Sequence, residues 1–332
     1  MLRIAINGYG RIGRALLRAL VERKLEQRLH LVAINDLCDP VTLVHLTCFD
    51  STFGRFPGHI GLHEDSMQVN DQSIHLLREP EAVELPWDSL GVDLVLECTG
   101  KLKNRAQVEQ HLTAGASRVL LSHPLESADM TVVYGVNQQL LGNQQIVSNG
   151  SCTTNCLAPL AKVLHQAVGI RQGLINTVHA YTNDQNLLDN AHGDLYRARA
   201  AALSIIPTST GAAKTIGLVL PELAGRLDGL AVRVPTANVS LLDLSFSAER
   251  PASREAINAA LKQGVQQLPA GVMECNELPL VSRDFNGYPA SCVVDLSHTR
   301  VQGDLVKVLA WYDNEWAFAN RMLDVLLAWL KP

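Results

Sequence analysis

A glycine-rich turn follows directly on the first predicted strand of this 332-residue chain. The apolar run Leu2–Asn7 leads into Gly8-Tyr9-Gly10-Arg11-Ile12-Gly13, and apolar residues then recur at helical spacing. In such a strand–turn–helix unit, Gly8 allows the tight turn, Gly10 lets a pyrophosphate approach the backbone, and Gly13 lets the helix pack on the strand. An ordinary connection between a strand and a helix is the alternative. The context of the turn favours a dinucleotide site.

An acidic residue follows the second predicted strand. Leu29–Asn35 is apolar, and Asp36 comes directly after it, 23 residues beyond Gly13. A carboxylate at this place can accept hydrogen bonds from the ribose hydroxyls of an adenosine. Strand, turn and acid together predict NAD as the cofactor.

Strands and helices continue to alternate up to residue 150. Asp93–Glu97 and Arg118–Ser122 read as strands, and Asn104–Ala114 between them reads as a helix. This alternation predicts an α/β fold whose first domain, residues 1–150, is a Rossmann-type doubly wound parallel sheet that binds NAD. Ligands of such sheets bind beyond the carboxyl ends of the strands, where Thr99, Gly100 and Ser122 lie.

The pattern changes in the second half of the chain, where several predicted strands have no helix between them. This favours a mainly antiparallel α+β catalytic domain over residues 151–315. Helices are predicted at Ser253–Gln267, with Ser253 as N-cap, and at Asn314–Leu330, which carries an apolar stripe. The strands expected here are 173–180, 229–234, 239–246, 292–296 and 305–312.

Composition excludes several classes of protein. The net charge of -5, without a long basic run, argues against nucleic acid or an anionic membrane as partner. No apolar run reaches about 18 residues, and the N-terminus lacks the layout of a signal peptide, so we expect a cytoplasmic protein. Seven irregularly spaced cysteines without a Cys-x-x-Cys fit reduced thiols, and we expect no metal site.

The stretch Ser148–Leu157 places a cysteine at the start of a predicted helix. Cys152 should lie in or just before the first turn, where free N–H groups and the helix dipole favour a thiolate. A small buried residue is the common role of a cysteine. Four polar neighbours, residues 151 and 153–155, favour a ligand site instead, so Cys152 is the candidate nucleophile.

A base for this thiol cannot be chosen among 11 histidines by spacing alone. His179 is the best candidate because it ends an apolar strand just ahead of the irregular segment Tyr181–Ser204. A histidine near a cysteine can raise the thiolate fraction and relay protons. The length of the irregular segment itself indicates a functional or interfacial loop.

Hydroxyl and guanidinium groups gather after this strand. The irregular segment carries Thr182 and Arg197, Thr210-Gly211 precede a predicted helix, and Arg233 ends a strand. Helix N-termini and arginine forks bind phosphate, so these residues indicate a phosphorylated substrate. Surface charge and an ordinary N-cap are the alternative explanations.

Six motifs together resemble the phosphorylating glyceraldehyde-3-phosphate dehydrogenase family over essentially the whole chain. They are Ser148–Cys156, Asn7–Arg14, Thr177–Gln185, Thr208–Lys214, Arg233–Thr236 and Trp311–Glu315. The resemblance implies that Cys152 attacks the aldehyde of glyceraldehyde 3-phosphate, His179 acts as base, and inorganic phosphate cleaves the resulting thioester. It also implies a cytosolic homotetramer and a C-terminal helix, residues 316–332, that returns to the NAD-binding domain.

The resemblance extends to binding residues. It assigns Thr182 and Arg233 to the substrate phosphate. The attacking phosphate is assigned to Ser151, Thr153, Arg197, Thr210 and Gly211. With the residues of the turn and the strand ends, the NAD site comprises Asn7, Gly8, Gly10, Arg11, Ile12, Asp36, Arg78, Thr99, Gly100, Ser122 and Asn314.

Departures from the family pattern leave some questions open. Gly150 stands where alanine is usual, and Asn190-Ala191 replace a Leu-Pro pair common in NAD-preferring members, so NADP is a weaker alternative cofactor. Two other functions stay open at this point. They are erythrose-4-phosphate dehydrogenase, which the chain resembles around Asn276–Ser282, and a non-catalytic nucleotide-binding regulator.

Overall fold

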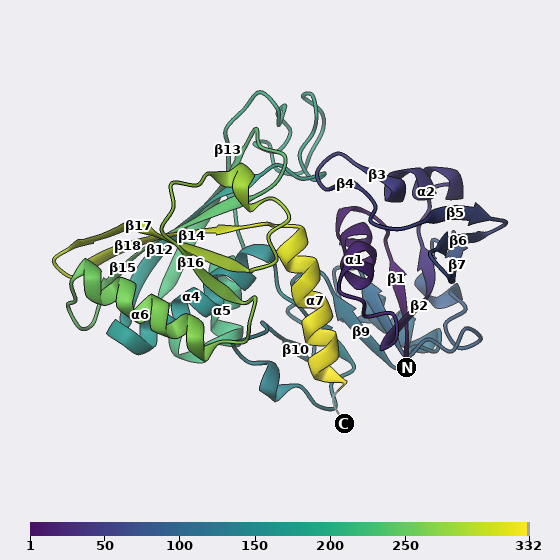
Figure 1. Cartoon of the computed structure of the whole chain (residues 1–332), viewed down its shortest axis with the longest axis horizontal. Coiled ribbons are helices and arrows are strands. Elements are labelled where there is room, and N and C mark those ends of the chain that lie inside the picture. Colours follow the sequence, from purple (N-terminus) through teal and green to yellow (C-terminus); the bar gives the residue numbers. More distant parts are fainter. Residues whose placement is uncertain (331–332) are drawn as a thin grey trace. The chain divides into compact units, whose positions relative to one another are not determined.

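The structure is a computed structural model that describes residues 1–330. The chain forms two units, shown in Figure 1. The first comprises residues 1–132, 139–150 and 322–330, and the second comprises residues 133–138 and 151–321. The short segment 133–138 thus groups with the second unit. The last helix, α7 (Trp316–Trp329), is shared, because the grouping changes at residue 322.

The first unit is built on a nine-stranded sheet with the order β10-β11-β9-β8-β1-β2-β7-β6-β5. Every pairing from β10 to β7 is parallel, and the β7-β6-β5 edge is antiparallel. The elements are β1 (Leu2–Asn7), α1 (Arg11–Glu22), β2 (Leu29–Asn35), α2 (Pro40–Cys48), β5 (Ile60–His63), β6 (Ser66–Val69), β7 (Gln72–Leu77), β8 (Leu94–Glu97), α3 (Arg105–Thr113), β9 (Arg118–Leu121), β10 (Met130–Thr131) and β11 (Ile146–Ser148). The predicted Rossmann-type sheet is confirmed.

The strand order reverses beside β1. From β1 the chain passes to β2 and β7 on one side, and then to β8, β9 and β11 on the other side. In doubly wound sheets, the carboxyl ends of the strands at such a reversal form the ligand site. Asn7 ends β1 and Glu97 ends β8, so both lie at this point.

The turn between β1 and α1 depends on its glycines. Gly8 has a φ of +90°, and a Cβ on Gly8 would lie 2.6 Å from the backbone nitrogen of Thr99. A Cβ on Gly13 would lie 2.4 Å from the carbonyl oxygen of Gly8. A Cβ on Gly10 would meet open space within 4 Å. Two glycines are therefore needed by the fold, and the third leaves the backbone open to a ligand.

The second unit contains a seven-stranded sheet with the order β13-β14-β12-β15-β18-β17-β16. Four of its six pairings are antiparallel, which confirms the mainly antiparallel prediction. The elements are α4 (Cys152–Val168), β12 (Ile170–Ala180), β13 (Ile206–Ser209), α5 (Ala212–Val219), β14 (Leu227–Val234), β15 (Ser240–Ala248), α6 (Arg254–Gln267), β16 (Met273–Asn276), β17 (Cys292–Gln302) and β18 (Leu305–Tyr312).

Helix α4 lies at the centre of this unit. Its residues from 153 to 161 are all buried, and it contacts α5, α6 and the strands of the sheet. Leu157, Leu160 and Leu164 are fully buried in one apolar cluster with side chains of β15, β17 and β18. Burying a leucine contributes roughly 1.5–3 kcal/mol, so this packing holds the start of α4 firmly at the sheet.

Several element boundaries differ from the predictions. The segment 50–63, predicted as irregular, contains short strands β3 (Phe49–Asp50) and β4 (Gly54–Arg55) as well as β5. Strand β17 extends six residues past the predicted end. Helix α7 begins at Trp316 rather than at residue 314, because the Asp313 carboxylate accepts hydrogen bonds from the backbone nitrogens of Glu315 and Trp316 at 2.9 and 2.8 Å. Within residues 1–330, no helix is long and apolar enough to cross a bilayer.

Candidate active site

Cys152 and His179 lie together in the second unit. Cys152 is the first residue of α4, and Ser151 caps that helix by accepting a hydrogen bond from the Thr154 backbone nitrogen at 3.1 Å. His179 is the penultimate residue of β12. The Cys152 Sγ atom is 3.5 Å from His179 Nε2, so the predicted nucleophile and base are within hydrogen-bond distance.

The shortest contact of the imidazole is the basis on which we assign its tautomer. His179 Nδ1 is 2.6 Å from the carbonyl oxygen of Ala180, an acceptor, so Nδ1 carries the proton and donates it. Nε2 is then the unprotonated nitrogen that faces the thiol. Arg233 Nη1 also donates to the Ala180 carbonyl, at 3.1 Å, and its 3.0 Å approach to Nδ1 is a contact between two donors rather than a hydrogen bond.

The positive charge of Arg233 affects the pKa values of both His179 and Cys152. Burial and then the positive charge of Arg233 lower the pKa of His179 to about 3, so the imidazole is neutral and can act as a base. Burial raises the pKa of the Cys152 thiol, and the charge of Arg233 opposes this rise. The geometry thus combines a neutral base with a cation that favours the thiolate.

A buried tyrosine, Tyr312, contacts both of the elements that carry Cys152 and His179. The Tyr312 hydroxyl lies 2.9 Å from Thr153 Oγ1 and 2.7 Å from Thr177 Oγ1, and the Tyr312 ring meets the His179 ring edge-on at 6.0 Å. Thr153 follows the nucleophile on α4, and Thr177 precedes the base by two residues on β12. Tyr312 therefore joins the two elements that carry the reacting groups. It also engages the Thr153 hydroxyl, which the resemblance assigned to phosphate.

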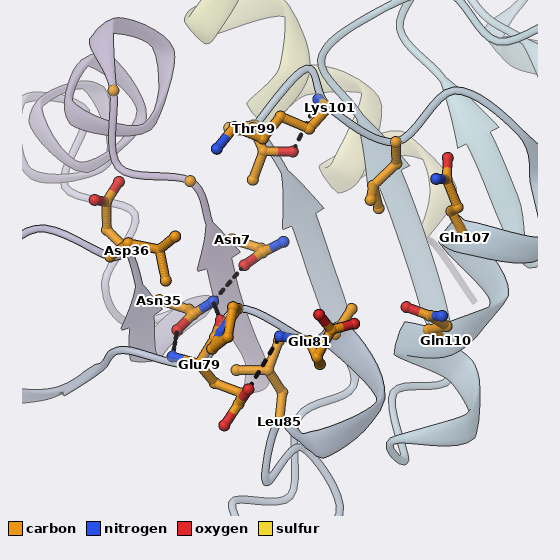
Figure 2. A pocket seen from close by; sticks show the side chains of 17 residues that line it. Asn7, Asn35, Asp36, Glu79, Glu81, Leu85, Thr99, Lys101, Gln107 and Gln110 are labelled. Atoms are coloured by element: carbon orange, nitrogen blue, oxygen red, sulfur yellow. Dashed lines mark hydrogen bonds between the residues drawn. The ribbon is translucent and has the colours of Figure 1, made fainter.

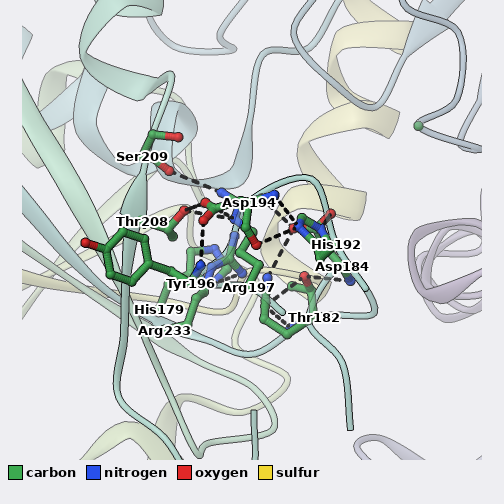
Figure 3. A network of polar contacts seen from close by, with 12 residues as sticks. His179, Thr182, Asp184, His192, Asp194, Tyr196, Arg197, Thr208, Ser209 and Arg233 are labelled. Atoms are coloured by element: carbon green, nitrogen blue, oxygen red, sulfur yellow. Dashed lines mark hydrogen bonds and ion pairs between the residues drawn. The ribbon is translucent and has the colours of Figure 1, made fainter. Parts of the chain in front are cut away.

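Arg197 is held in a polar network beside the pair, shown in Figure 3. Its Nη1 forms an ion pair with Asp184, its Nε donates to Thr208 Oγ1 at 2.9 Å, and its Nη2 donates to the Ser209 carbonyl at 3.3 Å. Asp194 accepts from the Thr208 hydroxyl at 2.8 Å and lies 3.5 Å from Arg197 Nε. The guanidinium is thus oriented before any phosphate arrives.

The remaining predicted phosphate residues lie around this network. The Thr182 backbone nitrogen donates to Gln185 Oε1 at 2.9 Å, which shapes the turn that carries Asp184. Thr210 and Gly211 precede α5 directly after the strand that Arg197 contacts, and Gly211 is the N-cap residue of that helix. The structure therefore gathers His179, Arg233, Arg197 and the start of α5 in one unit.

A cavity of about 400 Å³ lies at the carboxyl edge of the first sheet, where the strand order reverses (Figure 2). Five predicted cofactor residues line it, namely Asn7, Gly8, Gly10, Asp36 and Thr99. The Asp36 carboxylate accepts hydrogen bonds from the backbone nitrogens of Tyr9 at 2.8 Å and Cys38 at 2.9 Å, which hold it in place. The open approach to Gly10 and the fixed carboxylate both suit a dinucleotide.

Other predicted cofactor residues lie outside the lining of this cavity. They are Arg11, Ile12, Arg78, Gly100 and Ser122 of the first unit, and Asn314 of the second. Arg11 pairs with Asp50 at 2.5 Å, and Arg78 donates to the carbonyl of Leu37 at 3.2 Å. Asn314 Oδ1 accepts from the Ser240 hydroxyl at 2.9 Å, which fixes its side chain within its own unit.

Sequence reasoning missed several residues of both sites. It gave no role to Asp184, which falls within the Thr177–Gln185 motif, or to Asp194, which stands in the same irregular segment. It also missed Glu97, His111 and Trp87, which lie behind the cofactor cavity, because buried polar residues on separate elements share no spacing signal. Among residues 1–330, no group of three or more His, Cys, Asp or Glu side chains is arranged to hold a metal.

The cavity suited to a dinucleotide and the thiol–imidazole pair are the features expected of an NAD-dependent dehydrogenase. Comparison with family models agrees with this class. Residues 2–105 match the NAD binding domain of glyceraldehyde 3-phosphate dehydrogenase, and residues 151–314 match its C-terminal domain.

Full-length relatives share about half of the sequence. The chain is 54% identical to glyceraldehyde-3-phosphate dehydrogenase of Pseudomonas aeruginosa and to that of Xanthobacter flavus, with 98% of each chain covered. It is 53% identical to the plasmid-encoded enzyme of Cupriavidus necator, again over 98% of both chains. The chain belongs to the glyceraldehyde-3-phosphate dehydrogenase family.

Proposed function

We propose that the chain catalyses the phosphorylating oxidation of D-glyceraldehyde 3-phosphate to 1,3-bisphosphoglycerate with NAD and inorganic phosphate. The observation that carries this proposal is the 3.5 Å contact between Cys152 Sγ and the unprotonated Nε2 of His179, with two arginines beside it. A thiol, a neutral base and two cations are what the attack on a phosphorylated aldehyde requires.

The first step uses the thiol and the imidazole. Cys152 Sγ attacks the aldehyde carbon, and the thiol proton passes by way of His179 Nε2 to the aldehyde oxygen, so that a hemithioacetal forms and the imidazole is neutral again. His179 then takes the proton of the hemithioacetal hydroxyl as the carbon loses its hydride and becomes a thioester. When bound, NAD accepts the hydride released from that carbon.

The second step uses the phosphate site. Inorganic phosphate attacks the thioester carbon, the bond from carbon to Sγ breaks, and Cys152 leaves as a thiolate with the acyl phosphate as product. Arg197 would orient the attacking phosphate, together with Thr210 and Gly211 at the start of α5. Arg233 and Thr182 would hold the phosphate of the substrate. Asp184, which pairs with Arg197, restrains the guanidinium until phosphate competes for it.

We further infer a homotetramer in the cytoplasm. Apolar side chains of the irregular segment stand in solvent in the single chain, including Leu187, Leu195 and Leu203, which are 79%, 83% and 81% exposed. Contact with another subunit would cover them. All seven cysteines lie within the described residues and are free thiols, which fits a reducing compartment.

The test is an absorbance assay of NADH formation with NAD, phosphate and one aldehyde at a time. We expect rapid turnover with glyceraldehyde 3-phosphate and slow turnover with erythrose 4-phosphate. Faster turnover of erythrose 4-phosphate would assign the chain to that related activity. No turnover of either aldehyde by protein that binds NAD would indicate a non-catalytic regulator.

A further inference from the structure

A chain of buried hydrogen bonds runs behind the cofactor cavity. Glu97 ends β8, His111 lies on α3, and Trp87 lies just ahead of β8; all three are 0% exposed. An ionisable side chain is rarely buried to this degree unless it is fully hydrogen-bonded. Glu97 and His111 belong to neither the thiol site nor the predicted cofactor residues, so their burial requires an explanation.

The direction of the first hydrogen bonds is fixed by chemistry. The Trp87 indole nitrogen can only donate, and it lies 3.1 Å from His111 Nδ1, so Nδ1 is the acceptor. A protonated imidazole has no acceptor, so His111 is neutral and carries its proton on Nε2. That nitrogen lies 3.1 Å from Glu97 Oε2 and donates to it.

All the partners of the Glu97 carboxylate are hydrogen-bond donors. Asn7 Nδ2 donates to Oε2 at 2.6 Å, the Thr99 backbone nitrogen donates to Oε1 at 2.8 Å, and the Thr99 hydroxyl donates to Oε1 as well. The group is a carboxylate with each oxygen accepting two hydrogen bonds.

The hydrogen bond to Glu97 fixes the orientation of the Asn7 amide, and through it the orientation of Asn35 in the cavity wall. Because the Asn7 amide nitrogen faces Glu97, its oxygen Oδ1 faces the other way and accepts from Asn35 Nδ2 at 2.7 Å. Asn35 Oδ1 then accepts from the Glu79 backbone nitrogen at 2.9 Å, and Asn35 Nδ2 also donates to the Glu79 carbonyl at 2.9 Å (Figure 2). Asn7, Asn35, Glu79 and Thr99 all line the cavity.

We propose that Glu97 is a positioning residue for cofactor binding: held by His111 and Trp87, it fixes the amide of Asn7 and the backbone of Thr99 in the cavity wall. The groups around this position all donate hydrogen bonds, so the side chain here must accept them and must carry no donor itself. A carboxylate meets that requirement, and an amide of the same shape does not. This inference rests on NAD binding by the first unit, and it does not depend on which aldehyde the chain oxidises.

The decisive variant is Glu97→Gln, which keeps the shape but places an NH₂ group among four donors. Removing a buried negative charge should by itself strengthen the binding of the anionic pyrophosphate, so weaker binding can be assigned to the mismatched hydrogen bonds. We expect the dissociation constant of NAD, measured by titration calorimetry on the full chain, to rise by about 10–100-fold. The matched control is Glu84→Gln, the same change at an exposed position of the same unit, which should bind NAD normally.

A second pair of variants separates positioning from packing. His111→Gln can still donate to Glu97 and accept from Trp87, whereas His111→Leu can do neither. We expect the glutamine variant to bind NAD within about 3-fold of the unmodified chain and the leucine variant to bind it at least about 10-fold more weakly. In both Glu97→Gln and His111→Leu, the KM for NAD should rise while kcat at saturating NAD and the KM for the aldehyde stay unchanged.

Unchanged NAD affinity in folded Glu97→Gln would overturn the proposal. So would equal affinities of the two His111 variants, which decide the matter if Glu97→Gln does not fold. If the Glu97 and His111 variants unfold at lower urea concentration but keep a normal KM for NAD, the buried hydrogen bonds serve stability alone. Because calorimetry needs no turnover, an unmodified chain that binds NAD but oxidises no aldehyde would refute the proposed function and leave this inference standing.

Discussion

His179 presents its unprotonated Nε2 to Cys152 Sγ at 3.5 Å because its Nδ1 donates to the carbonyl of Ala180 at 2.6 Å. The imidazole is therefore oriented by the main chain next to it. The orientation does not depend on a third side chain such as the carboxylate found in many triads. Arg233, which donates to the same carbonyl, adds a positive charge beside both reacting groups.

Replacing the nucleophile should abolish oxidation but leave the cofactor site intact. We expect Cys152→Ser to bind NAD normally and to form no NADH above about a thousandth of the normal rate, because a neutral hydroxyl is a much weaker nucleophile than a thiolate. Cys156→Ser is the control. Cys156 is fully buried one helical turn later and should be dispensable for chemistry. Turnover by Cys152→Ser at a tenth of the normal rate would disprove covalent catalysis.

Replacing the base should slow the chemical step. His179→Asn can still donate to a nearby carbonyl but cannot accept the thiol proton, so hydride transfer should slow by about 10²–10⁴-fold. The measurement is a stopped-flow trace of NADH formation in a single turnover, with His192→Asn, a change in the neighbouring loop, for comparison. An unchanged rate in the His179 variant would assign the base to another group.

The charge of Arg233 should be visible in the pH dependence of Cys152 reactivity. Burial raises the pKa of this thiol and Arg233 opposes the rise, so Arg233→Gln should raise the pKa further. The thiolate fraction at neutral pH falls, and the profile of alkylation against pH moves to higher pH. We expect alkylation by iodoacetamide at neutral pH to slow by at least about 5-fold, because even in bulk water two unit charges 4 Å apart attract by ~1 kcal/mol and burial strengthens that attraction.

The control for this effect is Arg233→Lys, which keeps the positive charge and should keep most of the reactivity. A profile that moves to lower pH in Arg233→Gln would contradict the assigned role. The same removal of charge should raise the pKa of His179, which burial and Arg233 now hold at about 3. Chemical-shift titration of the His179 ring checks that second direction independently.

Local patterns in the sequence predicted the elements that carry chemistry. The glycine turn, the helix that starts at Cys152 and the strand that ends near His179 each have a short-range cause, and each appears where it was expected. The 3.5 Å contact between Cys152 and His179 joins residues 27 positions apart. Spacing alone could not select this histidine, because the contact depends on how β12 and α4 pack in the folded sheet.

The remaining site residues depend on long-range packing. Glu97 contacts His111 and Asn7 only because β1, β8 and α3 come together, and no period in the sequence connects them. Tyr312 reaches Thr153 and Thr177 for the same reason, through the order of strands in the second sheet. The sequence also missed strands β3 and β4, which are two residues long and too short to show any alternation.

Cofactor choice should favour NAD over NADP by about 10–100-fold in kcat/KM. The Asp36 carboxylate is fixed by two backbone nitrogens in the cavity, so it cannot easily turn away from a 2′-phosphate. Two like unit charges about 4 Å apart at an effective dielectric near 20 repel by roughly 4 kcal/mol, a ceiling that solvent reduces. Steady-state assays with both cofactors measure the ratio.

Asp36→Gly should narrow this ratio, because it removes the repulsion. The Asn190-Ala191 pair should act in the opposite direction, because it replaces a rigid Leu-Pro pair with an amide that can donate to a 2′-phosphate; Asn190 Oδ1 accepts from the Ala191 backbone nitrogen at 2.8 Å. Equal use of both cofactors by the unmodified chain would show that Asp36 does not control the choice.

A rapid-mixing experiment shows whether oxidation leaves a thioester on Cys152 that only phosphate resolves. The chain is mixed with glyceraldehyde 3-phosphate and excess NAD without phosphate, and NADH is followed by absorbance. We expect a burst of NADH no larger than one equivalent per chain, then a halt, and steady turnover to an acyl phosphate once phosphate is added. Continuous turnover to the free acid without phosphate would show that water, and not phosphate, resolves the thioester.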